Sequence, residues 1–192
     1  MDIIKVEKRD FKAKAKQLRR AGIVPCCVYG GGLPDSISIQ MGRQAAEQLC
    51  RTKRQGSKVR LDLDGRLIPV QIKEKTTNFA DGRAEHIQFQ ALKADQKVNS
   101  VAHILVKNAD SIPGVLERML IEIPFASLPA DMVDTVTVDL EGMAVGTVLT
   151  VGDIPEFQDG RIELQIRDDS LVLRISDKKR AGVHEMVQDE LG

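Results

Sequence analysis

The strongest constraint on the fold is an alternation of apolar and polar residues that recurs along most of the chain. The clearest case is residues 58–75, KVRLDLDGRLIPVQIKEK, in which two alternating runs flank an Asp64-Gly65 pair. A period of two places successive side chains on opposite faces of a β-strand, and Asp-Gly is a preferred two-residue hairpin turn. This segment therefore predicts a β-hairpin.

The second half of the chain shows the same alternation, and no segment of it predicts a long helix. The strand-like segments are residues 101–106, 118–125, 135–140, 161–166 and 171–176. Glycine and proline residues separate them, as is typical of a β-sandwich or barrel. We expect an all-β domain at 93–180 and a polar tail at 181–192, which could begin as a frayed helix.

The first half combines strands with short helices. Strands are predicted at 3–8, 24–30, 36–41 and 85–92. A basic segment at 12–22 predicts a loop that runs into a short helix, for which Gly22 is a suitable stop. Residues 42–52 predict a second helix because their apolar residues fall near one face. The expected fold class is mainly β with short helices, an α+β arrangement, with a first domain at 1–92.

Charge divides the chain at the same place. The whole sequence is neutral, with 28 basic and 28 acidic residues, but residues 1–92 hold 18 basic and 10 acidic ones. Residues 93–192 reverse these numbers. A basic half is the natural candidate to bind a polyanion, and an acidic half is not. The alternative is that this asymmetry is an ordinary fluctuation of charge along a sequence.

A basic cluster near the N-terminus strengthens the nucleic-acid interpretation. Seven cations and one anion lie between Lys8 and Arg20, and the cations include Arg9, Lys12, Lys14, Lys16 and Arg19. Such a cluster favours RNA or DNA because each neutralised phosphate releases counterions, and arginine adds bidentate bonds. A solvated basic helix face is the simpler alternative.

Aromatic residues are too scarce for a typical reader of single strands. The chain has one tyrosine, five phenylalanines and no tryptophan. A structured RNA duplex fits better, because it is read by shape, phosphates, 2′-hydroxyls and groove edges. Tyr29, His86 and Gln88 are candidates for groove contact, and the last two share one strand face. Tyr29 could equally border the core, and His86 could be structural.

Other functional classes find little support. No phosphate-binding loop, dinucleotide fingerprint or nucleophile elbow is present, so we expect no enzyme activity, cofactor or small-molecule substrate. Cys26 and Cys27 are neighbours on a strand and poorly placed to bridge each other, and no histidine near them completes a zinc site. The N-terminus lacks an apolar signal core and no run would span a bilayer, so we expect a cytoplasmic protein without membrane contact.

Three motifs in the first half resemble those of a known family. LRRAGIVP (18–25), VYGG (28–31) and HIQFQAL (86–92) occur in the order and spacing of the 5S-rRNA-binding protein family of the bacterial large ribosomal subunit. Residues 116–146 resemble the C-terminal β domain of the long, two-domain form, which includes the general stress protein Ctc. The resemblance covers residues 1–180.

The resemblance implies more than the patterns do. It implies that the N-terminal domain is a small β-barrel with helices that binds the loop E region of 5S rRNA within the large subunit, beside neighbouring ribosomal proteins. The implied RNA contacts are Arg9, Lys14, Arg19, Arg20, Tyr29 and His86. Gln88 stands where the family usually has aspartate, and unlike aspartate it can donate as well as accept hydrogen bonds.

The departures from the family pattern leave a second function open. Gln17 replaces a residue that is basic in many members, and Gln88 replaces the usual acid. Under this alternative the protein is a stress-linked adaptor that binds a protein partner through its acidic β domain and anchors only weakly to RNA. Under the first interpretation the acidic domain faces protein neighbours or solvent.

Overall fold

The computed structural model describes residues 2–158 and 160–177, and they form two compact units. Within the described residues, the first unit comprises residues 2–100 together with Leu128–Asp134. The second comprises Val101–Ser127 and the described residues between 135 and 177. Strands dominate both units, which confirms the expected fold class. The tail expected at 181–192 lies outside the described residues.

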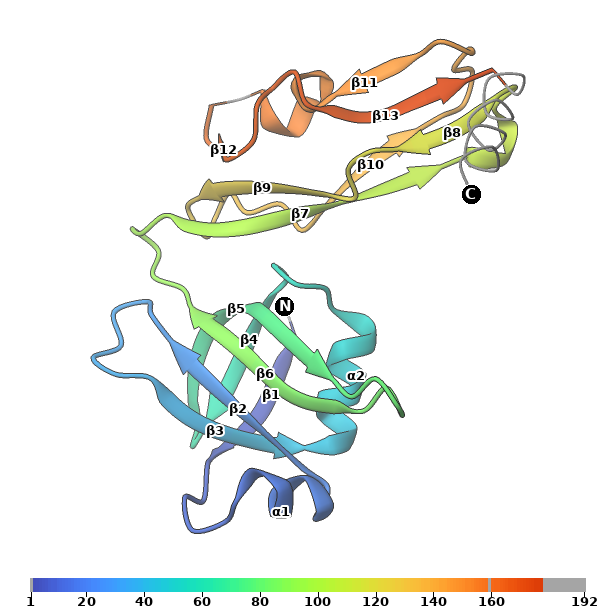
Figure 1. Ribbon diagram of the computed structural model, residues 1–192. Helices are drawn as coiled ribbons and strands as arrows, with labels where there is room; N and C mark the ends of the chain where they lie inside the picture. Colours follow the sequence, from blue (N-terminus) through green and yellow to red (C-terminus); the bar gives the residue numbers. More distant parts are fainter. Residues whose placement is uncertain (1, 159, 178–192) are drawn as a thin grey trace, which may run out of the picture. The chain divides into compact units, whose positions relative to one another are not determined.

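The first unit is a closed six-stranded barrel with the strand order β1-β3-β2-β6-β5-β4 (Figure 1). Antiparallel pairs make up most of the barrel, while parallel pairing joins β1 to β4 and β2 to β6. Its strands are β1 (Ile3–Lys8), β2 (Ile23–Tyr29), β3 (Ile37–Gly42), β4 (Lys58–Leu63), β5 (Arg66–Thr77) and β6 (Ala84–Ala91). The barrel predicted from the family resemblance is therefore present.

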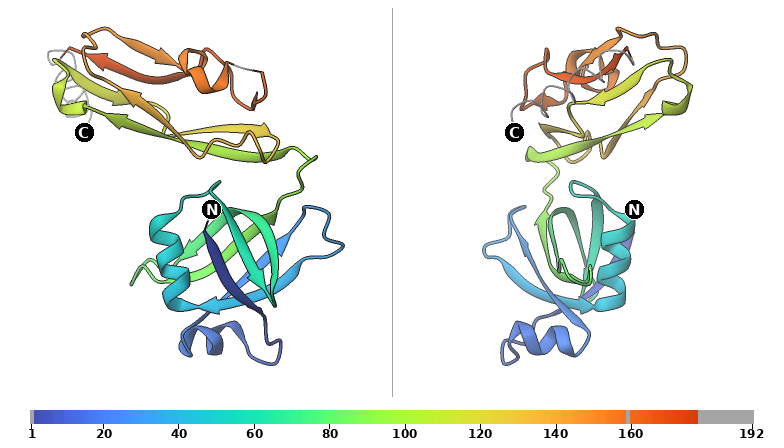
Figure 2. Two further views of the ribbon diagram at one scale, coloured as in Figure 1. Left: turned by 180° about the vertical axis from the view of Figure 1, so that it is seen from behind. Right: turned by 45° about the vertical axis from the view of Figure 1, so that its right-hand side comes forward.

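Two α-helices belong to the described part of this unit. Helix α1 (Ala15–Arg20) connects β1 to β2, and Gly22 follows it with a left-handed φ of 78°. Helix α2 (Arg43–Thr52) lies against the side of the barrel (Figure 2) and adds Ala46 and Leu49 to the core. Both helices match the segments predicted from the sequence.

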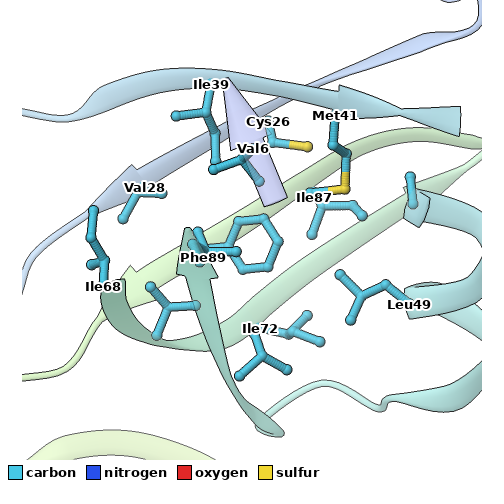
Figure 3. Packing of buried hydrophobic residues seen from close by; sticks show 14 of the residues in the cluster. Val6, Cys26, Val28, Ile39, Met41, Leu49, Ile68, Ile72, Ile87 and Phe89 are labelled. Carbon is cyan, nitrogen blue, oxygen red and sulfur yellow. The ribbon is translucent and has the colours of Figure 1, made fainter. Parts of the chain in front are cut away.

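The barrel interior is filled by the apolar members of the alternating strands (Figure 3). Ile87 and Phe89 of β6 are 0% exposed, whereas His86 and Gln88 beside them are half-buried. Cys26 of β2 is buried and Cys27 is half-buried, as expected for neighbours on opposite faces. Packing on the inner face thus fixes which side chains β2 and β6 present outside.

The ladder between β5 and β6 contains two irregularities that change this alternation. Ile72 pairs with Phe89 and Glu74 pairs with Gln88, so Lys73 is an extra residue on β5. Thr76 pairs with His86 and Thr77 with Ala84, so Glu85 is an extra residue on β6. These are β-bulges, which re-aim side chains and are common next to functional sites.

Glycines close the turn between β2 and β3. Gly30, Gly31 and Gly32 all have positive φ values. At Gly31 an added Cβ would lie 2.5 Å from the backbone oxygen of Ala91 and 2.7 Å from its side chain. The turn therefore needs glycine there for two reasons, backbone conformation and a close approach to the end of β6.

The second unit is built from two sheets, with strand orders β10-β7-β9-β12 and β11-β13-β8. Helical structure in its described residues is limited to three short 3₁₀ turns, at 109–111, 151–153 and 155–157. Its strands are β7 (Val98–Lys107), β8 (Val115–Arg118), β9 (Glu122–Ser127), β10 (Thr135–Asp139), β11 (Val148–Thr150), β12 (Glu163–Leu164) and β13 (Leu171–Ser176). The all-β prediction for this half is confirmed.

Two strand predictions in this unit were wrong in extent. Residues 118–125 form no single strand, because the chain leaves β8 in one sheet and enters β9 in the other. Within 161–166 only Glu163 and Leu164 form a strand, since they alone pair with β9, at Ala126 and Phe125. Alternation predicted the side-chain pattern but could not show where backbone pairing stops.

Candidate nucleic-acid interface

One outer face of the barrel gathers hydrogen-bonding side chains from β2, β6 and β5. His86, Gln88 and Gln90 alternate along β6 with the buried core residues. In the parallel pairing of β2 with β6, Cys27 lies opposite Gln88 and Tyr29 opposite Gln90. Three predicted site residues, Tyr29, His86 and Gln88, therefore share one surface.

Glu74 joins this surface from β5. It is exposed and lies opposite Gln88 in the ladder, and the Gln88 side-chain Nε2 donates a hydrogen bond of 2.9 Å to Glu74 Oε2. The sequence analysis missed Glu74 because the bulge at Lys73 changes the phase of β5. Simple alternation would place residue 74 on the same face as the buried Ile72.

The cations of helix α1 and of the loop before it lie beside this surface. Arg19 is half-buried, and its Nε donates a hydrogen bond of 3.1 Å to the backbone oxygen of Glu85, the bulge residue of β6. Lys14, Lys16 and Arg20 are exposed. Arg19 is thus held at the edge of β6, while the other three cations are free to reach a ligand.

Arg9 approaches the same surface from the end of β1. Its backbone N–H donates to Ser38 of β3 at 3.1 Å, which fixes the chain where β1 ends. Within the described residues the side-chain Nε of Arg9 is buried and has no hydrogen-bond partner. A buried guanidinium nitrogen without a partner is costly, so a shift of the Arg9 side chain that brought Nε to a ligand oxygen would gain a strong bond.

Charged neighbours on this surface influence the pKa of His86. Burial lowers the pKa of His86, the positive charges of Arg19 and Arg9 lower it further, and the Glu74 carboxylate opposes them. The imidazole is therefore held toward its neutral form, which has one donor and one acceptor nitrogen. Neutral histidine suits contact with a base edge or a 2′-hydroxyl.

A basic hollow of about 520 Å³ continues the surface between α1 and the β5–β6 hairpin. Its lining residues are Lys16, Arg19, Arg20, Arg43, Asn78, Asp81, Arg83, Ala84 and Glu85. Arg43 also positions α1, because its side chain donates to the backbone oxygen of Arg19 and its N–H donates to that of Gly22 at 2.8 Å. No sequence pattern linked Arg43 and Arg83 to the N-terminal cluster.

The arrangement has the chemistry to bind phosphates and to contact the edges of a groove. Cations from three separate segments flank a strip of neutral polar side chains, which suits a polyanion with readable edges. Among residues 2–158 and 160–177, no group of three or more acidic, histidine or cysteine side chains is placed to hold a metal ion. Within the same residues, no helix is long and apolar enough to span a membrane.

Comparison with known proteins gives matches along nearly the whole chain. The model of the Ribosomal L25p family matches residues 4–89, and that of Ribosomal protein TL5, C-terminal domain, matches residues 97–179. Among curated relatives, the large ribosomal subunit protein bL25 of Geobacillus thermodenitrificans is 30% identical over 152 residues, covering 77% of this chain and 72% of that protein. The bL25 protein of Nitrosomonas europaea is 26% identical over 181 residues, covering 91% of each chain.

Proposed function

The chain belongs to the Ribosomal L25p family in its long, two-domain form, and from that premise we propose that it binds 5S rRNA at the loop E region. Its relatives carry the name of a large ribosomal subunit protein, which supports the proposal that this chain is a non-catalytic component of that particle. The protein then works in the cytoplasm as part of the ribosome, with rRNA and neighbouring ribosomal proteins as partners.

The observation that carries the proposal is the convergence of distant residues on one face of the barrel. Arg19 of α1 donates to the backbone oxygen of Glu85, next to His86 of β6, and the adjacent Gln88 and Gln90 pair with Glu74 of β5 and Tyr29 of β2. A duplex offers two regular rows of phosphates with a groove between them, and this face offers cations beside a neutral polar strip. The two patterns are complementary.

Each predicted residue has a distinct role in the proposal. Arg9, Lys14, Lys16, Arg19 and Arg20 bind phosphates and sugars and so fix the position of the protein on the duplex. The residues of the strip, Tyr29, His86 and Gln88, contact groove edges. Positioning thus comes mainly from α1 and the segment before it, and recognition comes from the sheet.

The acidic half has a different role. We assign RNA binding to residues 1–92 and contact with protein neighbours or solvent to residues 93–180, because an excess of carboxylates cannot favour RNA electrostatically. The alternative function, a stress-linked adaptor, has no support among the matching relatives, whose names refer to the large ribosomal subunit.

A salt titration tests the proposal on the full chain. The slope of log K against log[salt] for 5S rRNA should correspond to roughly 4–8 phosphate contacts, and affinity for a scrambled duplex should be lower. The double variant Arg19→Ala, Arg20→Ala should lose one to two units of slope, at about 0.7–0.9 per phosphate contact. The matched control, Arg60→Ala with Arg66→Ala, removes two exposed arginines of β4 and β5 and should leave the slope unchanged.

Two results would contradict the proposal. A nearly flat salt dependence would remove phosphate contact as the basis of binding. Equal affinity of the wild-type protein for 5S rRNA and for the scrambled duplex would reduce the interaction to generic attraction of a polyanion.

A further inference from the structure

Glu74 is a negative charge in a surface that otherwise favours anions. Its carboxylate acts electrostatically on His86, and the charges of Arg9 and Arg19 act on the same imidazole. A carboxylate near RNA phosphates repels them, so at this position it lowers the affinity for any polyanion. Its presence needs a compensating interaction that a phosphate cannot provide.

The backbone places Glu74 on this surface by a specific irregularity. The extra residue, Lys73, lies between Ile72, which faces the core opposite Phe89, and Glu74, which faces outward opposite Gln88. Without the bulge, the period of two would turn residue 74 to the inner face. The chain therefore departs from regular sheet geometry at the point where it presents this carboxylate.

The side chain is also oriented. Gln88 Nε2 donates to Glu74 Oε2 at 2.9 Å, which holds one carboxylate oxygen of this exposed side chain. One N–H of the Gln88 amide is used on the carboxylate, and the carboxylate itself has only acceptors to offer a ligand. This is an arrangement for receiving a hydrogen-bond donor from a ligand.

RNA offers few donors at such a surface. In the shallow groove of an RNA helix the base edges present acceptors, except for the 2-amino group of guanine, and the remaining donors are the 2′-hydroxyls. A carboxylate accepts and cannot donate, so among the base edges of this groove it discriminates in favour of the guanine amino group. We propose that Glu74, positioned by Gln88, accepts a hydrogen bond from a guanine 2-amino group and is the specificity-determining residue of this RNA-binding face.

This inference rests on the proposed function, and its first test compares specificity with affinity. Glu74→Ala should lower the ratio of affinities for 5S rRNA and an unrelated duplex by about tenfold, the size expected for one good base contact. Affinity for the unrelated duplex should stay the same or rise, because a repulsive charge has gone. The control Asp64→Asn removes one negative charge from the β4–β5 turn, at the other end of β5, and should leave the ratio unchanged.

The second test identifies the contacted group. A set of 5S rRNAs is prepared in which single guanines are replaced by inosine, which lacks only the 2-amino group. For the wild-type protein, one substitution should lower affinity about tenfold, and for Glu74→Ala the same substitution should have no further effect. Gln88→Ala should weaken the response to that same inosine, because it acts through Glu74.

The outcomes separate this inference from the proposed function. If the wild-type protein prefers 5S rRNA and Glu74→Ala keeps both that preference and the inosine response, the inference is wrong and the function stands. Sensitivity of the wild type to a 2′-deoxy substitution in place of inosine would also overturn it, since Glu74 would then contact the sugar. A wild-type protein without preference for 5S rRNA would overturn both.

Discussion

Gly31 is the position where one added methyl group has the most sharply defined consequence. In Gly31→Ala the new Cβ would lie 2.5 Å from the backbone oxygen of Ala91, where ordinary contact requires at least about 3.4 Å. The neighbouring backbone must therefore move by about 1 Å. The left-handed φ of 59° adds strain of about 1–2 kcal/mol for a non-glycine residue.

A matched variant separates these two contributions. Gly65 has a φ of 82°, but nothing lies within 4 Å of an added Cβ, so Gly65→Ala should show the strain alone. Crowding of the kind at Gly31 adds about 1–3 kcal/mol, so Gly31→Ala should be less stable than Gly65→Ala by that amount. Both variants gain equally from a stiffer unfolded chain, and this gain cancels in the comparison.

Urea unfolding can be followed on the barrel alone. The chain has a single tyrosine, Tyr29 in β2, and no tryptophan, so tyrosine emission reports on the first unit. Because Gly31 lies two residues beyond Tyr29, the variant should also bind RNA less tightly. Equal unfolding midpoints for Gly31→Ala and Gly65→Ala would refute the argument that the close approach to β6 matters.

Three further changes test how the barrel supports its binding face. Arg43→Ala removes the hydrogen bond from α2 to the last turn of α1, and it should lower the free energy of unfolding by about 1–2 kcal/mol and weaken RNA binding. The control Arg51→Ala, at an exposed position of α2, should change the free energy of unfolding by less than about 0.5 kcal/mol in the urea assay. Lys75→Met removes hydrogen bonds of 3.1 and 2.6 Å to the backbone oxygens of Cys50 and Lys53 at the end of α2, and it should lower the free energy of unfolding by about 1–3 kcal/mol. An unchanged urea midpoint would mean that these bonds do not stabilise the helix. The pKa of His86 is lower in the folded protein than its usual 6.5, so the unfolded chain takes up the proton at a higher pH than the folded protein does. The free energy of unfolding should therefore fall as the pH drops below about 6.5. His86→Asn should flatten that part of a curve of stability against pH.

Much of the barrel was predictable because its local signals agree. The alternation of β6 predicted that His86 and Gln88 share a face, and burial of Ile87 and Phe89 on the other face fixes this in the structure. At the Asp64-Gly65 turn, both residues have positive φ and the Asp62 carboxylate accepts from the Gly65 N–H at 2.9 Å. Strand alternation and the Asp64-Gly65 turn depend only on residues that are close in sequence, so the sequence alone predicts them.

The parts that sequence reasoning missed depend on pairing across the chain. The bulge that exposes Glu74 exists only relative to β6, because an extra residue is defined by the strand opposite. Arg43 reaches Arg19 only after α2 has packed against the barrel. Periodicity within one strand carries no information about either, and the predicted site was therefore narrower than the surface in the structure.

The extra residue at Lys73 has a consequence for how this protein can change through evolution. Loss of the codon for Lys73 would bring Glu74 directly after Ile72, where regular alternation still turns it outward opposite Gln88. Loss of the codon for Glu74 would instead put Lys73 in that place and exchange the carboxylate for a cation. Lys75 and Thr76 keep their pairing in both cases, so a descendant of this chain could lose one residue here, and the choice of codon would decide the sign of the charge that this surface presents.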